Sequence, residues 1–71
     1  MNQDFYKKLG ENIKLRRKQL DMTQQIVADK VGISLNFYGK IEVAFSKPSL
    51  NTLIIIAKSL NTTVSDLTKD C

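Results

Sequence analysis

The sequence predicts an all-α protein in which five short helices pack around one hydrophobic core. Apolar residues recur every three or four positions in several segments, which is the spacing of an amphipathic helix. Serine or threonine stands immediately before most of these segments, where it can cap a helix. No stretch alternates apolar and polar residues for long enough to form a convincing strand. We therefore expect residues 1–71 to form a single compact domain.

The first helix is expected to begin with Asp4 as its N-cap and to run to about Leu20. Asp21 follows, where the chain leaves the helix. Four apolar side chains would share the inward face of this helix, namely Phe5, Leu9, Ile13 and Leu20.

The next segment predicts two helices joined by a tight turn. Thr23 would cap a helix over 24–31, and Ser34 would cap another over about 35–43. Between them, Gly32 would end the first of the two in the left-handed conformation that a residue without Cβ adopts cheaply.

Small and apolar residues at fixed offsets hold these two helices together. Ala28 lets the following helix pass over it, because a larger side chain would push the two apart. The pattern predicts a helix-turn-helix over residues 23–42, whose second helix is presented outward and can enter the major groove of DNA. The apolar positions of the motif are Val27, Val31, Ile33, Tyr38 and Ile41.

Two further helices, within about 49–68, are expected to complete the core. Ser49 would cap a helix that runs to about Leu60. Thr63 would cap a short fifth helix and form a capping box with Asp66. The inward side chains would be Leu50, Leu53, Ile56, Ala57, Leu60, Val64 and Leu67.

Composition favours a polyanionic partner and argues against an enzyme. The net charge is +4, and basic residues crowd the first quarter of the chain, whereas the charges after Ser49 are balanced. The chain has no histidine and a single cysteine, Cys71, so we expect no enzymatic activity, no cofactor and no metal. No apolar run approaches the roughly 18–20 residues of a membrane span. These features predict a cytoplasmic protein that does not enter a membrane.

The chain also carries landmark residues over nearly its whole length: Leu9-Gly10, Arg17, Met22-Thr23-Gln24, Ala28, Gly32, Ile41-Glu42, Pro48-Ser49-Leu50, Leu53, Ile56-Ala57 and Asp66-Leu67. Their combination resembles the lambda-repressor-like, Cro/repressor class of helix-turn-helix regulators, also called the xenobiotic-response-element type. The resemblance implies that fold and binding to double-stranded DNA. It also implies a homodimer on a palindromic operator and, usually, repression of transcription.

The chain departs from the usual pattern of that family at several places. Val43-Ala44-Phe45 follows the Ile-Glu that ends the third helix, where a basic or polar residue and then a glycine are usual. Asp21 also stands where glycine is common. Leu35 occupies a base-facing position that is more often polar, and Ile26 and Ile55 replace exposed polar residues. These departures concern the operator sequence and the dimer surface rather than the fold.

The third helix is expected to read the bases. Asn36 can form two hydrogen bonds with adenine, Lys40 can donate to guanine or to a phosphate, and Leu35 can contact a thymine methyl group. Gly39 costs the helix about 1 kcal/mol relative to alanine; it either lets the backbone approach the bases or has no role. Phe37 either lines the groove or folds back onto the loop after this helix.

Other residues are expected to bind the DNA backbone. By the resemblance, the Gln24 amide in the first turn of the second helix holds a phosphate, the alternative being a solvated residue without a role. Ser34 is expected to be a helix cap first and a phosphate contact second. Lys47, in the loop before the fourth helix, is a candidate backbone contact. Thr23, the cap of the second helix, completes the DNA-facing set.

Two further groups concern the protein itself. The resemblance makes Arg17 and Glu42 a structural ion pair that ties the first helix to the end of the third. Ile54 and Ile55 make the fourth helix apolar over more of its circumference than one core stripe needs. We expect these two residues, together with Leu67, to form the two-fold contact of a dimer.

A protein-binding role of the same fold is the alternative function. An antitoxin or an interaction module would use Phe45, Ile26 or the Ile54-Ile55 patch to bind a partner protein. Within the DNA-binding class, three roles stay open, namely a phage or mobile-element repressor, a controller of a restriction–modification system, and a general regulator.

Overall fold

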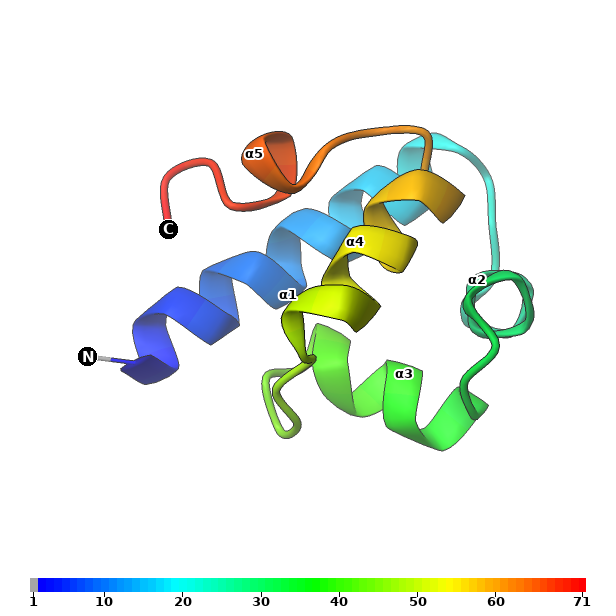
Figure 1. Cartoon of the computed structure of the whole chain (residues 1–71), viewed down its shortest axis with the longest axis horizontal. Helices are drawn as coiled ribbons and strands as arrows, with labels where there is room; N and C mark the ends of the chain where they lie inside the picture. Colours follow the sequence, from blue (N-terminus) through cyan, green and yellow to red (C-terminus); the bar gives the residue numbers. More distant parts are fainter. Residues whose placement is uncertain (1) are drawn as a thin grey trace.

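The computed structural model describes residues 2–71, which form five helices around one core (Figure 1). The described part of the chain is all-α, as its sequence predicts. The helices are α1 (Asn2–Gln19), α2 (Gln24–Val31), α3 (Leu35–Glu42), α4 (Leu50–Ser59) and α5 (Val64–Leu67).

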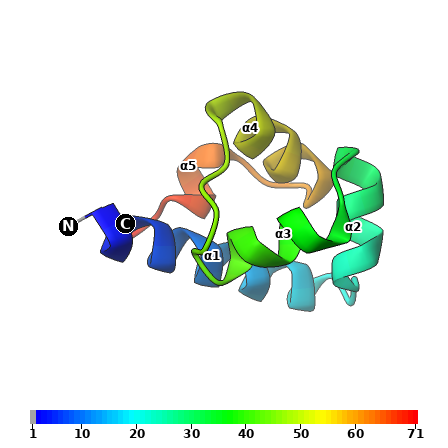
Figure 2. The same ribbon diagram turned by 90° about the horizontal axis from the view of Figure 1, so that it is seen from below.

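The helices pack so that α3 is held from two sides and keeps one face free. It contacts α1 and α2, while α2 also packs against α4, and α5 lies against α1 and α4. Figure 2 shows α2 and α3 crossing steeply on either side of a tight turn. The core side chains come from all five helical segments: Leu9, Ile13, Val27, Ala28, Tyr38, Ile41, Leu53, Ile56, Ala57, Leu60 and Leu67.

The start of each helix after α1 is fixed by a side-chain cap, as predicted. The hydroxyls of Thr23, Ser34, Ser49 and Thr63 each accept a hydrogen bond from the backbone N–H three residues later, at 3.0 to 3.1 Å. Each cap of this kind contributes about 1 kcal/mol, because it satisfies an N–H that the helix leaves without a partner.

Left-handed residues end several elements. Gly32 has φ = 85° and donates its N–H to the carbonyl of Ala28, which ends α2 as predicted. Asp21, after α1, has φ = 56°, so an aspartate takes the conformation that glycine commonly supplies. Ala44, after α3, has φ = 63°, and a Cβ makes that conformation costly.

Three local predictions are wrong. Asp4 lies inside the first turn of α1 and is not its N-cap, because the helix already begins at Asn2. Leu50 is 68% exposed, because the buried stripe of α4 begins only at Leu53. The capping box of α5 is half formed: Thr63 caps the backbone of Asp66, but the Asp66 carboxylate accepts from the hydroxyl of Thr62 at 3.1 Å instead.

None of the helices in residues 2–71 combines the length and the apolar character that crossing a membrane requires.

Candidate nucleic-acid interface

The two faces of α3 differ as the sequence predicts. Tyr38 and Ile41 are buried in the core, so the opposite face is left for solvent or a ligand. On that face Leu35 and Asn36 are exposed, and Lys40 is partly exposed. An outward helix face with an amide, an ammonium and an aliphatic group has the donor, acceptor and apolar chemistry that base edges in the major groove require.

A hollow on the surface brings the predicted reading residues together with the start of α2. It is shallow and open, and Gln24 forms its wall on the α2 side. Val43 also lines the hollow and is 71% exposed; it departs from the usual family pattern but was not predicted to lie in the site. The residues around the hollow are Gln24, Leu35, Asn36, Gly39, Lys40 and Val43.

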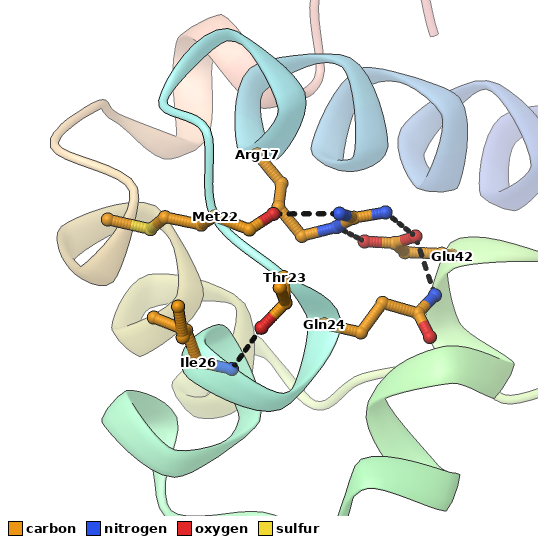
Figure 3. Close-up of polar contacts among 6 residues, drawn as sticks. All are labelled: Arg17, Met22, Thr23, Gln24, Ile26 and Glu42. Atoms are coloured by element: carbon orange, nitrogen blue, oxygen red, sulfur yellow. Dashed lines mark hydrogen bonds and ion pairs between the residues drawn. The ribbon is translucent and has the colours of Figure 1, made fainter.

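Behind this hollow, Arg17 and Glu42 form the predicted ion pair between α1 and α3 (Figure 3). Arg17 Nε donates to Glu42 Oε2 at 2.7 Å and Nη2 donates to Oε1 at 3.1 Å, while Nη1 donates to the carbonyl of Met22 at 2.9 Å. Both residues are buried. Such a bidentate, charge-assisted pair fixes the direction in which the end of α3 meets α1.

The pair is charged over the physiological pH range. Burial raises the pKa of the Glu42 carboxyl, but the hydrogen bonds from Arg17 and Gln24 outweigh burial, so that pKa lies below its usual value. The hydrogen bond to Glu42 raises the pKa of the Arg17 guanidinium. The pair therefore keeps both charges, and each charge has its counter-charge in contact.

The Tyr38 hydroxyl is buried close to this pair, and burial raises the pKa of the hydroxyl well above the usual value for tyrosine. Among the described residues, Tyr38 Oη is the one buried side-chain polar atom without a hydrogen-bond partner. The hydroxyl therefore remains neutral, and the ring acts mainly as the largest fully buried side chain of the core.

Gln24 is held by the same carboxylate. Its Nε2 donates to Glu42 Oε1 at 3.0 Å, so the residue predicted to bind phosphate is already bonded within the protein (Figure 3). Residue spacing does not predict this contact, because Gln24 and Glu42 stand at the two ends of the helix-turn-helix.

The two lysines predicted to touch DNA both rest on aromatic rings. Lys40 Nζ lies 5.3 Å from the ring centroid of Phe45, and Lys47 Nζ lies 5.3 Å from that of Tyr6. Phe45 is 76% exposed. Cation–π contacts at exposed sites are worth about 0.5–1 kcal/mol, enough to favour one direction for each lysine.

The remaining residues predicted to face DNA are two helix caps, an aromatic side chain that packs on the core, and a glycine. The hydroxyls of Thr23 and Ser34 are taken up as helix caps, as expected for Ser34. Phe37 packs against the hydrophobic core and is half-buried, which disfavours a role on the groove wall. A Cβ at Gly39 would meet only the Gln24 amide, at 3.6 Å or beyond, so the fold tolerates a side chain there.

The prediction of a dimer contact is wrong for one of its three residues. Leu67 is only 2% exposed, because α1 and α4 cover α5 from both sides and its side chain lies in the core. Ile54 is 37% exposed and Ile55 is half-buried, so both still present apolar surface on α4.

Gly10 has a role that was not predicted from the sequence. This glycine is buried, and a Cβ there would lie 2.8 Å from the carbonyl oxygen of Ile41 and closer still to that of Glu42. The absence of a side chain at Gly10 therefore lets α1 approach the end of α3 and bring Arg17 to Glu42. A glycine inside an otherwise helical pattern was the available signal.

Comparison with known proteins agrees with this architecture. The family model described as Helix-turn-helix matches residues 13–67. The chain is 35% identical over 60 residues to the cryptic phage CTXphi transcriptional repressor RstR of Vibrio cholerae, covering 84% of this chain but only 54% of that protein. It is 34% identical over 64 residues to the control protein C.SmaI of Serratia marcescens, covering 90% and 76% of the two chains.

The fold also matches a solved structure. The restriction-modification controller protein C.AhdI of Aeromonas hydrophila superposes with a TM-score of 0.85 over 87% of this chain and 94% of that one, at 21% identity. The family model covers more than half of the chain, which therefore belongs to the helix-turn-helix family of Cro/repressor type, a family of transcriptional regulators.

Proposed function

We propose that this protein binds double-stranded DNA in a sequence-specific manner as a homodimer and represses transcription from a palindromic operator. The observation that carries the proposal is the hollow between α2 and α3, where Asn36, Lys40 and Leu35 face outward beside Gln24. The similarity to a phage repressor and to control proteins supports a regulatory role. The predicted cytoplasmic location agrees with that role.

In this proposal the dimer places two copies of α3 in successive major grooves, about 34–36 Å apart. Lys47, the start of α2 and the long-range field of the basic first quarter hold the phosphates and set the register. Asn36, Lys40 and Leu35 then read the bases. A dimer bound over a promoter blocks polymerase, whereas the same dimer placed just upstream would activate transcription.

One experiment tests the proposal directly. The purified protein is used to select binding sites from a random duplex library, and the surviving sequences are determined. A palindromic motif with half-sites one helical turn apart supports a dimeric regulator. A reporter gene with that motif over its promoter then decides between repression and activation.

Exposed apolar residues at the end of α3 favour a second candidate function, the binding of a partner protein. Val43 and Phe45 are the two most exposed large apolar side chains described. If the selection enriches no sequence and binding is weak, an antitoxin-like or adaptor role replaces the first proposal. A partner that co-purifies with the protein, and is lost in Phe45→Ser, would establish that role.

A further inference from the structure

Glu42 has a second partner besides Arg17, and that partner lies on the proposed DNA-binding surface. One carboxylate oxygen, Oε1, accepts both from Arg17 Nη2 at 3.1 Å and from Gln24 Nε2 at 3.0 Å. The Glu42 side chain is 1% exposed, whereas Gln24 is half-buried at the edge of the hollow. A buried carboxylate thus connects the ion pair behind α3 to the surface in front of it.

The chemistry of this contact fixes which end of the Gln24 amide faces inward. An ionised carboxylate can only accept hydrogen bonds, so the nitrogen end of the amide must face Glu42. The carbonyl oxygen points away from it (Figure 3). That oxygen lies over Gly39, 3.6 Å from where a Cβ would stand, so the amide rests against α3 without a clash.

Charge would otherwise work against such an arrangement, because a carboxylate close to the DNA backbone repels phosphate. Here the guanidinium of Arg17 is bonded to both oxygens of Glu42, so the pair as a whole is neutral. Glu42 can therefore hold a residue at the DNA surface at little electrostatic cost.

We propose that Glu42 is a positioning residue for DNA binding: its carboxylate holds the Gln24 amide so that the second hydrogen on Nε2 is directed to a backbone phosphate before DNA arrives. A side chain that is already held loses less conformational freedom on binding. The inference rests on the proposed function, since it concerns affinity for DNA. Beyond that function, it gives the buried ion pair a part in binding as well as in folding.

A double-mutant cycle tests the inference. Gln24→Met removes the amide at nearly constant size, Glu42→Gln removes the carboxylate charge, and the two changes are also combined. Dissociation constants are measured for the selected operator and for random duplex, at a temperature where circular dichroism shows each variant to be folded. Gln25→Met is the matched control, because the Gln25 amide bonds to exposed Asp29 of the same helix and not to Glu42.

We expect Gln24→Met and Glu42→Gln each to weaken binding by about tenfold on both duplexes, the effect of one hydrogen bond to a charged group. The double variant should have the same dissociation constant as the single variant that binds DNA more weakly, because both changes disable the same phosphate contact. Gln25→Met should leave affinity unchanged. If the two losses multiply in the double variant, Glu42 does not act through Gln24 and the inference is overturned.

A second measurement keeps the inference testable if Glu42→Gln does not fold. Nuclear magnetic resonance of the wild-type protein gives the exchange rates of the Gln24 and Gln25 side-chain amide hydrogens with water. Slower exchange at Gln24 is expected, whereas equal rates would overturn the held amide. If the wild type itself selects no operator, the proposed function fails; if it selects one and the losses multiply, only this inference fails.

Discussion

Gly10 of α1 lies directly against the backbone of Ile41 at the end of α3, so close that a Cβ on Gly10 would stand 2.8 Å from the Ile41 carbonyl oxygen. The obstacle is backbone, which cannot rotate aside as a side chain can. This contact sets the separation of the two helices that carry Arg17 and Glu42. Gly10 and the ion pair therefore act together to place α3, and with it the surface proposed to bind DNA.

Gly10→Ala should destabilise the fold by about 2 kcal/mol, the cost of forcing an extra carbon into a packed contact, despite the higher helix propensity of alanine. Gly39→Ala is the matched control in another helix. A Cβ there meets only Gln24 at ordinary contact distance, so this variant should gain about 0.5–1 kcal/mol. Urea unfolding measures the free energy of unfolding of both variants. A change of the same sign in Gly10→Ala and Gly39→Ala would contradict the packing argument.

Ala44→Gly should stabilise the protein by about 0.5–1 kcal/mol. Ala44 is held at φ = 63°, where Cβ costs about 1–2 kcal/mol, and the greater freedom of glycine in the unfolded chain offsets part of the gain. Asn61→Gly is the control, because Asn61 has a similar φ of 55° but asparagine tolerates that region. A thermal melt should therefore show a clear increase for Ala44→Gly and little change for Asn61→Gly.

How much the sequence predicts depends on how local the cause is. The caps at Thr23, Ser34 and Ser49 were predictable, because each bond spans three residues and the side chain alone supplies the acceptor. The same holds for the left-handed Gly32. The outward face of α3 followed from helical spacing together with the two core positions.

Predictions that depend on tertiary neighbours were less successful. Leu67 could be surface or core, and only the positions of α1 and α4 around it decide for the core. The bond between Gln24 and Glu42 joins residues 18 positions apart, and no pattern of residue types announces it. Gly10 was a landmark of the family resemblance, yet its reason became clear only with the backbone of α3 in place.

The contribution of the Arg17–Glu42 pair to stability should depend on pH in one direction. The folded pKa of Glu42 lies below its ordinary value of 4.5, so its contribution is full above that value and is lost as pH falls through the folded pKa. At pH 7, Glu42→Gln should cost about 3 kcal/mol, because it leaves a buried guanidinium without its counter-charge. Urea unfolding of wild type and Glu42→Gln at pH 7 and pH 3 gives the difference in their free energies of unfolding. This difference should be smaller at pH 3, and an equal difference at both pH values would contradict the predicted pH dependence.

Base reading and backbone binding should separate in mutants of the DNA-facing set. Asn36→Ala should lose about 1–3 kcal/mol of discrimination at one operator position per half-site. Lys47→Ala should weaken all duplexes alike and reduce the salt slope of the binding constant by about one unit. Binding measurements on single-base operator variants at two salt concentrations distinguish the two effects, and identical profiles for both mutants would refute the assignment of roles.

Charged substitutions on the proposed dimer surface of α4 should separate the two protomers. On α4, Ile54 and Ile55 stay at least partly uncovered, as does Leu50 at the start of the helix. A glutamate at position 54 or 55 would be buried unpaired in a two-fold contact. Ile54→Glu should therefore shift the protein to a monomer, and Ile55→Glu should act in the same way. Leu15→Glu is the control, since Leu15 is 59% exposed on α1 and lies outside the proposed contact. Sedimentation velocity should show a dimer for wild type and Leu15→Glu only. Because two linked half-sites bind far more tightly than one, the monomeric variants should also lose the palindromic operator while keeping weak binding to random duplex. A dimer that survives Ile54→Glu and Ile55→Glu would place the two-fold contact elsewhere on the molecule.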